Sequence, residues 1–334
     1  MGRLLPLVTL AVATLLAGCG GEPTDDDDRG SSATTSTDPA ASSSEISDVA
    51  PYVEVGAGPV GITSAADGAV WVVSSASDQV SRIPRGASEP DLVVDVPGTP
   101  LRAVAAGDAV WVTSFRGEQL LRIDAATGEV TDTLETAAGP EGVTAGFGSI
   151  WVVEQDAGRL VRIDPETRKV VDRVDIGVGA RLATAGTDAL YVAAFADDRV
   201  LRVDPRTLEV TRSPKVCGGP QGMAELDGTL WVACTFADQV VAVDTATLRR
   251  TAVVPVEGLP DSVVADDGRL LVLAEEGPRL VVVDPAGAEV TREVVLGEET
   301  ALYDSANLDL AVSADEVWAT SFKADRVHHL PVPR

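Results

Sequence analysis

The sequence predicts an all-β protein, a seven-bladed β-propeller, and three observations support this prediction. A column of aromatic or leucine residues recurs at a nearly constant spacing, and each repeat holds about four short β-rich runs. No run of useful length after residue 50 has the spacing of an amphipathic helix. Repeats of about 40 residues with four strands each are the building unit of β-propellers.

The repeating column is the clearest of these signals. Its spacing is 40 residues, except for a last step of 47 residues that predicts a longer loop over residues 296–310. Strand alternation in the run AVWVV would turn Val70 and Val72 toward one neighbouring blade, and Trp71 and Val73 toward the other. We therefore interpret the column as packing between blades. Its members are Trp71, Trp111, Trp151, Tyr191, Trp231, Leu271 and Trp318.

The turns of the repeats are also regular. Asp-Gly and Gly-Asp pairs predict tight hairpins between the first and second strands. In five repeats the third run ends in an aspartate, which we expect to bond the amides of its own turn. Calcium binding is the alternative, but the dense carboxylates of a calcium loop are missing there. These aspartates are Asp124, Asp164, Asp204, Asp244 and Asp284.

The two ends of the repeat region complement each other. Residues 51–55 (PYVEV) resemble a fourth strand before the first blade, and residues 327–334 resemble a third strand without a fourth. We expect the N-terminal strand to complete blade seven and close the ring, which removes the open edges. Residues 51–334 are therefore predicted to form one propeller domain.

Three motifs carry a family resemblance: GP-x-G, DG-x-[VL]-WV and V-x-[RV]-[IV]-D. Over residues 51–334 they resemble the bacterial YVTN and NHL-like propeller repeats, including the virginiamycin B lyase-like (streptogramin lyase) group. For an enzyme of that group the resemblance implies a metal-assisted elimination, with a loop histidine as acid or base and a glutamate near magnesium. Here His328 and His329 fall in the third run of the last repeat, and Glu154 is the one acid at its repeat position. We therefore assign no catalytic residue, no metal and no cofactor.

The N-terminal segment reads as a targeting signal. Residues 1–19 contain Arg3, an apolar run over residues 4–16 that is too short to span a bilayer, and the ending LAGC. This ending resembles the bacterial lipobox, which implies lipidation of Cys19, export, and anchoring to the outer face of the cell membrane. A plain secretory signal is the alternative. Residues 20–50 are rich in Ser, Thr and Asp and predict a disordered tether.

Charge and cysteine usage limit the possible partners. The chain has 52 acidic and 26 basic residues, so nucleic acid is excluded as a partner, because phosphate neutralisation needs clustered Lys and Arg. Once Cys19 is lipidated, Cys217 and Cys234 remain as an even pair in an exported chain, which favours a disulfide. Two buried thiols are the alternative.

Candidate binding residues lie on one face, formed by the loops from strand four to strand one and from strand two to strand three. We call it the upper face, and we expect these loops to expose a mixed rim that includes three aligned phenylalanines, or else simply solvated loops. The rim residues are Phe115, Arg116, Glu141, Gln155, Arg181, Phe195, Gln221, Phe236, Asp261, Glu275, Asp309, Phe322 and Lys323.

The functional prediction is a monomeric binding or interaction module for a peptide, glycan, small molecule or partner protein. The alternatives are a metal-dependent lyase-like or hydrolytic enzyme and a structural or sensor domain of the cell envelope. A bound metal, or a carboxylate pair with a strongly raised pKa, would favour the enzyme, whereas a continuous apolar rim would favour the binder.

Overall fold

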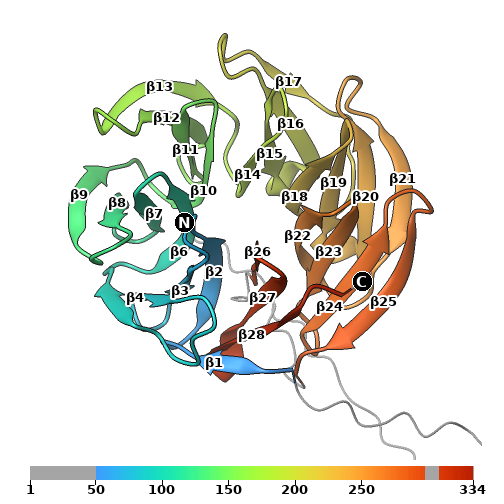
Figure 1. Cartoon of the computed structure of the whole chain (residues 1–334). Coiled ribbons are helices and arrows are strands. Elements are labelled where there is room, and N and C mark those ends of the chain that lie inside the picture. The colour runs from blue at the N-terminus through green and yellow to red at the C-terminus, as the bar shows by residue number, and fades with distance from the viewer. Residues whose placement is uncertain (1–49, 298–307, 334) are drawn as a thin grey trace, which may run out of the picture. The chain divides into compact units, whose positions relative to one another are not determined.

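A computed structural model describes residues 50–297 and 308–333, which belong to one compact unit. They form seven four-stranded antiparallel sheets, arranged as blades around a central axis (Figure 1), so the predicted fold class is confirmed. The predicted signal segment with Cys19, and nearly all of the predicted tether, lie outside the described residues. Within the described ranges no helix is both long enough and apolar enough to cross a membrane.

The strands follow one another blade by blade along the chain. Blades 1 to 3 consist of β2 (Pro59–Ser64), β3 (Val70–Ser74), β4 (Gln79–Ile83), β5 (Leu92–Asp95); β6 (Pro100–Ala106), β7 (Ala109–Ser114), β8 (Gln119–Asp124), β9 (Val130–Glu135); and β10 (Pro140–Gly146), β11 (Ser149–Glu154), β12 (Arg159–Asp164), β13 (Lys169–Asp175). Blades 4 to 6 consist of β14 (Ala183–Ala185), β15 (Leu190–Ala194), β16 (Arg199–Val203), β17 (Val210–Arg212); β18 (Pro220–Leu226), β19 (Thr229–Cys234), β20 (Gln239–Asp244), β21 (Arg250–Pro255); and β22 (Pro260–Asp266), β23 (Arg269–Ala274), β24 (Arg279–Asp284), β25 (Glu289–Val295).

Blade 7 contains both ends of the ring. It consists of β26 (Leu310–Ser313), β27 (Glu316–Ser321), β28 (Arg326–Pro331) and, as its outer strand, β1 (Tyr52–Glu54). Tyr52 pairs with His328 and Glu54 pairs with Arg326, so the N-terminal strand closes the ring as expected. The longer connection leads from β25 to β26, and residues 298–307 of it lie outside the described ranges. Short 3₁₀ helices follow the second strands of blades 4, 5 and 7: η1 (Phe195–Asp197), η2 (Thr235–Ala237) and η3 (Phe322–Ala324).

The core of the ring lies between neighbouring blades. Trp71 packs with Val110 and Val112 of blade 2, whereas Val72 packs on the opposite side against Trp318 of blade 7. This is the division of faces that strand alternation predicts for blade 1. The column residues have at most 3% of their surface exposed, so they are packing residues, and the apolar clusters they join close the circle.

The lower face, opposite the upper face, is formed by the turns from strand one to strand two and from strand three to strand four, and its aspartate turns follow the predicted pattern. Oδ1 of Asp124 accepts hydrogen bonds from the amides of Ala126 at 3.0 Å and Thr127 at 2.9 Å. The Thr127 amide is the main cause that holds the pKa of the Asp124 carboxyl below its usual value. Equivalent bonds to turn amides are made by Asp164, Asp204, Asp244 and Asp284. The expected turn role of these aspartates is therefore confirmed.

Candidate functional site

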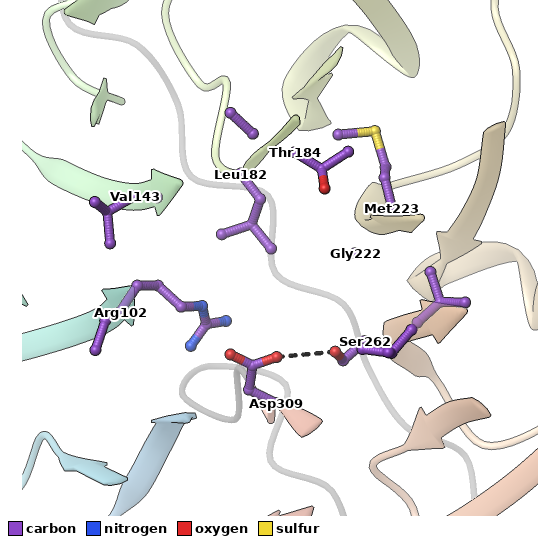
Figure 2. Close-up of a pocket in the computed structure, with 13 residues that line it drawn as sticks. Arg102, Val143, Leu182, Thr184, Gly222, Met223, Ser262 and Asp309 are labelled. Atoms are coloured by element: carbon purple, nitrogen blue, oxygen red, sulfur yellow. Dashed lines mark hydrogen bonds between the residues drawn. The ribbon is translucent and has the colours of Figure 1, made fainter. Parts of the chain in front are cut away.

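A small cavity lies on the ring axis, just inside the upper face (Figure 2). Its volume is about 130 Å³, and its walls come from the first strands β6, β10, β14, β18 and β22, together with Asp309 before β26. Apolar side chains such as Leu182 and Met223 form part of the wall. Four polar side chains complete it: Arg102, Thr184, Ser262 and Asp309. The cavity thus combines both signs of charge with two hydroxyl groups.

Glycines on alternate blades allow the first strands to come this close to one another. A Cβ added at Gly142 would lie 2.6 Å from the carbonyl oxygen of Arg181 in the next blade. A Cβ at Gly222 would lie 2.6 Å from the carbonyl oxygen of Asp261. Larger residues at these positions would push the inner strands apart, so the glycines keep the axial cavity narrow.

Arg102 and Asp309 approach each other across the mouth of the cavity (Figure 2). Nη1 of Arg102 donates to the carbonyl oxygen of Val60 at 2.7 Å, which holds the guanidinium in place. Oδ1 of Asp309 accepts from the Ser262 hydroxyl at 2.9 Å and from the Leu310 amide at 2.9 Å. Burial raises the pKa of the Asp309 carboxyl, and the nearby charge of Arg102 opposes that rise.

A second ion pair joins blades 3 and 4 beside the cavity. Nε of Arg181 donates to Oε1 of Glu141 at 2.9 Å, and only 1% of the surface of Glu141 is exposed. Burial raises the pKa of the Glu141 carboxyl, while the charges of Arg181 and Arg102 lower it. The Arg181 guanidinium also lies 4.7 Å from the centre of the Phe195 ring, a cation–π contact.

Asp261 and Glu275 form a buried carboxyl pair within blade 6. Burial is the largest cause that raises the pKa of Glu275, to about 10, and the charge of Asp261 adds to it. Burial also raises the pKa of Asp261, to about 6, against the opposing charges of Arg102 and Arg181. The pair therefore shares one proton over the neutral pH range.

Most of the predicted rim residues are not exposed to solvent. Only Arg116, Phe236 and Lys323 are exposed; Glu141, Gln221, Asp261 and Glu275 are buried, and the others are half-buried: Phe115, Gln155, Arg181, Phe195, Asp309 and Phe322. The expectation of three exposed phenylalanines is thus wrong. The Phe195 and Phe322 rings lie over the backbone of a neighbouring inter-blade loop instead, at Gly219 and Gly58 respectively.

The structure also brings Arg102 and Ser262 into one cavity, which the repeat spacing in the sequence does not predict. Arg102 and Ser262 line the cavity at the repeat position where Gly142 and Gly222 stand in other blades. A polar side chain that interrupts a column of glycines is the sequence signal that could have identified them.

The magnesium site implied by the lyase resemblance does not fit these residues. The Glu154 carboxylate is occupied by the Ala137 amide at 2.8 Å and by the Arg159 guanidinium at 3.5 Å. His328 is buried with Nδ1 3.3 Å from the carbonyl oxygen of Ala50, and His329 stacks on Trp318 with ring centres 4.6 Å apart. Among residues 50–297 and 308–333, no three His, Cys, Asp or Glu side chains are grouped to hold a metal ion.

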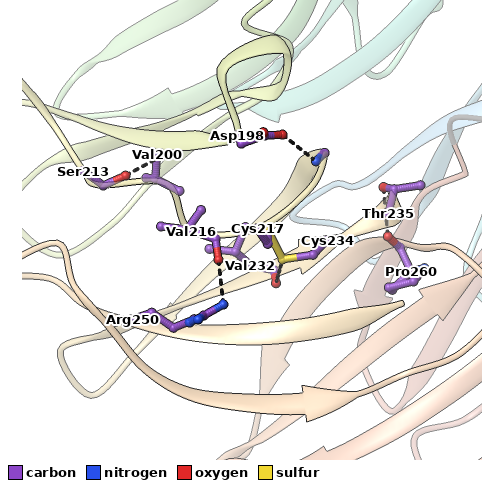
Figure 3. The surroundings of a disulfide bond; sticks show 11 residues. Asp198, Val200, Ser213, Val216, Cys217, Val232, Cys234, Thr235, Arg250 and Pro260 are labelled. Atoms are coloured by element: carbon purple, nitrogen blue, oxygen red, sulfur yellow. Dashed lines mark hydrogen bonds between the residues drawn. A yellow bond between two sulfur atoms is a disulfide. The ribbon is translucent and has the colours of Figure 1, made fainter. Parts of the chain in front are cut away.

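A disulfide joins Cys217 to Cys234, with the sulfurs 2.08 Å apart (Figure 3). It ties the loop that leads into blade 5 to the end of β19, close to η2. Both attachment points lie on the upper face, so the bond holds two neighbouring upper-face segments together.

The comparisons with known proteins agree with the fold. The model of the virginiamycin B lyase family matches residues 45–172, which is less than half of the chain. No curated protein is similar enough to count as a match.

Several solved structures share the architecture. A streptogramin B lyase structure matches with a TM-score of 0.72 and 16% sequence identity, and the match covers 83% of this chain and 95% of the lyase chain. Virginiamycin B lyase from Staphylococcus aureus has a TM-score of 0.69 and 19% identity, covering 83% of this chain and 95% of its own. BamB from Moraxella catarrhalis has a TM-score of 0.58 and 16% identity, covering 81% of this chain and 82% of its own. At these identities the likeness concerns the fold.

Proposed function

We propose that this chain, a β-propeller of the virginiamycin B lyase type in its fold, is a binding module that holds a small polar ligand in its axial cavity. The observation that carries the proposal is the cavity itself, where Arg102, Ser262 and Asp309 converge from blades 2, 6 and 7. Concave sites with a few converging polar groups are the usual form of small-molecule sites. The cavity volume of about 130 Å³ favours a small ligand over the other predicted partners.

The charges around the cavity define the ligand class. Four carboxyl groups, those of Asp309, Glu141, Asp261 and Glu275, lie in or beside the cavity, against the two guanidinium groups of Arg102 and Arg181. A ligand that brings hydrogen-bond donors would complement this excess. We therefore propose a hydroxyl- or ammonium-bearing compound, either free or as the end of a glycan or peptide.

A thermal-shift screen of the full-length chain in detergent tests the proposal. Monosaccharides, short amines, dipeptides and divalent metal salts are the probes, and a bound ligand should raise Tm with its concentration. Asp309→Asn should remove the shift, whereas Asp315→Asn, an exposed aspartate on the lower face, should keep it. A screen without any concentration-dependent shift, or a shift that Asp309→Asn leaves intact, would contradict the proposal.

A lyase-like or hydrolytic enzyme is a second candidate, because the structure contains the raised-pKa carboxyl pair that favours it. A protonated carboxyl beside an ionised one can act as acid and base in turn. Incubation of the full-length chain with virginiamycin B, with and without Mg²⁺, provides the test. The binding proposal expects no consumption. Consumption that Glu275→Gln abolishes would establish the enzyme instead.

We also propose that the chain is exported and anchored by lipid on Cys19, so that the ring is held at the outer face of the cell membrane. The support is the LAGC motif at the end of the apolar run, followed by a polar segment. Labelling with a palmitate analogue should mark the wild-type chain and not Cys19→Ser. Equal labelling of both would refute the anchor.

A further inference from the structure

A second feature of the upper face lies away from the axial cavity, over blades 4 and 5. Val178 and Phe236 have 68% and 58% of their surface exposed, the two largest values among the large hydrophobic residues of the described chain. Val178 stands at the tip of the loop before blade 4, between two glycines with positive φ angles. Phe236 lies in η2 and is joined to its neighbour Phe195 in an edge-to-face contact, with ring centres 5.3 Å apart.

Backbone and ring contacts link the segments that carry these side chains. The amide of Ala196 donates to the carbonyl oxygen of Gly179 at 3.3 Å, which ties the Val178 loop to η1 and therefore to Phe195. A Cβ added at Gly219 would lie 2.9 Å from the Phe236 ring and 3.1 Å from the Phe195 ring, so both rings cover the backbone of that loop. We call Val178, Phe195 and Phe236 the apolar patch.

The disulfide lies at this place in the ring. Cys234 is two residues before Phe236, and Cys217 is two residues before Gly219. One covalent bond therefore joins the segment that carries the Phe236 side chain to the loop that this side chain covers. The other blades, as far as the structure describes them, are packed without a disulfide. Holding an exposed anchor in one position lowers the ordering cost of binding. The exposed aromatic and its covalent support are two separate observations that indicate a contact surface.

The charge around the patch indicates what it contacts. Exposed acids lie beside each part of the patch: Asp156 near the Val178 loop, Asp197 in η1, and Asp238 after η2. Oδ1 of Asp238 also accepts hydrogen bonds from the amides of Gly258 and Leu259. Two bases lie close by: Lys215 is paired with Asp198 at 3.0 Å, and Arg181, which is paired with Glu141 at 2.9 Å, lies 4.7 Å from the centre of the Phe195 ring. Residues 51–334 carry 44 acidic and 24 basic residues, so an anionic lipid surface would be repelled. An apolar centre with an acidic border complements a basic segment with apolar side chains.

We propose that the apolar patch docks a basic polypeptide segment whose apolar side chains pack on Phe236 and on Val178. This surface is separate from the axial cavity, and the proposal does not depend on the small ligand. Phe236 supplies the exposed aromatic contact, and the flanking aspartates select positive charge in the partner.

Fluorescence anisotropy with the full-length chain in detergent tests this inference. The probe is a short labelled peptide of alternating Lys and Leu, compared with a Glu–Leu peptide and a Lys–Ser peptide. Wild-type protein should bind Lys–Leu at least about tenfold more tightly than either control peptide. Phe236→Ser and Val178→Ser should each weaken Lys–Leu binding by about tenfold.

The matched control variant is Val93→Ser, which changes a valine with 57% exposure on the outer strand β5. It should leave peptide binding unchanged, and circular dichroism should show the same fold for all three variants. No Lys–Leu binding by the wild type, equal losses in Val93→Ser and Phe236→Ser, or equal binding of the Glu–Leu peptide would each overturn the proposal. Phosphatidylcholine vesicles that bind the wild type and not Phe236→Ser, with peptide binding intact, would assign the patch to lipid instead.

Discussion

Aspartates of the lower face and carboxyl groups of the upper face are the same chemical groups in opposite situations. Asp124 lies half-buried at the surface, accepts hydrogen bonds from turn amides and has a lowered pKa. Asp261 and Glu275 are buried against each other, and their pKa values are raised. The lower-face acid recurs in five repeats, whereas the upper-face pair occurs in blade 6 alone among the described blades. Repetition therefore marks the acids that build the ring, and its interruption marks the acids that give one face its chemistry.

Removal of a repeated element should have the largest effect. Deletion of Pro51–Val55 takes β1 from the outer edge of β28, and with it the buried Val53. Because this strand closes the ring, we expect the whole propeller to lose stability, with a large fall in Tm and a less cooperative transition. Differential scanning calorimetry of the full chain and the deletion is the measurement. An unchanged Tm would show that closure does not depend on β1.

The disulfide tests whether an irregular feature also supports the ring. Replacing Cys217 and Cys234 with alanine removes a cross-link between residues 17 positions apart in sequence. In the chain-entropy model this should lower the free energy of unfolding by about 3 kcal/mol. Urea unfolding of the full chain, with and without reductant, measures this difference. Reductant should lower the stability of the wild type and leave the double variant unchanged. Equal stability of both proteins would mean that the bond serves only the apolar patch.

The carboxyl pair should reveal itself in the pH dependence of stability. The pKa of Glu275 rises from 4.5 unfolded to about 10 folded, so the folded state holds the extra proton between these values. The Glu275 proton should therefore make stability fall as pH rises across that range, contributing at most about 1.4 kcal/mol per pH unit, and the raised pKa of Asp261 adds to the fall up to about pH 6. Glu275→Gln should flatten this slope and be more stable than the wild type at pH 8. Parallel pH profiles in urea unfolding would contradict the shared proton.

Asp124→Ala should have the smallest effect, with the opposite pH dependence. The lowered pKa of Asp124 contributes stability above its unfolded value of 3.8, and this contribution is lost as pH falls through the folded pKa. The variant should thus melt slightly below the wild type at pH 7, and the two curves should converge in acid. A Tm difference that persists at low pH would mean that the side chain acts by something other than its charge.

The same contrast explains how far the sequence predicts the molecule. A fixed period of 40 residues aligns Trp71, Trp111 and Trp151 and so predicts the blades, their packing faces and the aspartate turns. These features depend on contacts within a blade or between adjacent blades, which the repeat itself specifies.

The upper-face chemistry depends on contacts that the repeat does not specify. Arg102 and Asp309 lie far apart in sequence and meet only because the closed ring brings blades 2 and 7 toward the axis. Burial of Glu141 and Glu275 could not be read from loop positions, since loops of polar composition are ordinarily solvated. Hence the candidate rim contained the right residues of the carboxyl pair but predicted the wrong exposure for them.

The closing strand also sets the order in which the molecule can be completed. Strand β1 is the first part of the ring to be synthesised, yet its partner β28 is the last strand of the described chain. Until synthesis ends, Val53 has no blade to enter, and the growing sheet stack presents unpaired edges. Completion of the fold is therefore a late, long-range event, expected to be slow compared with the formation of each local blade.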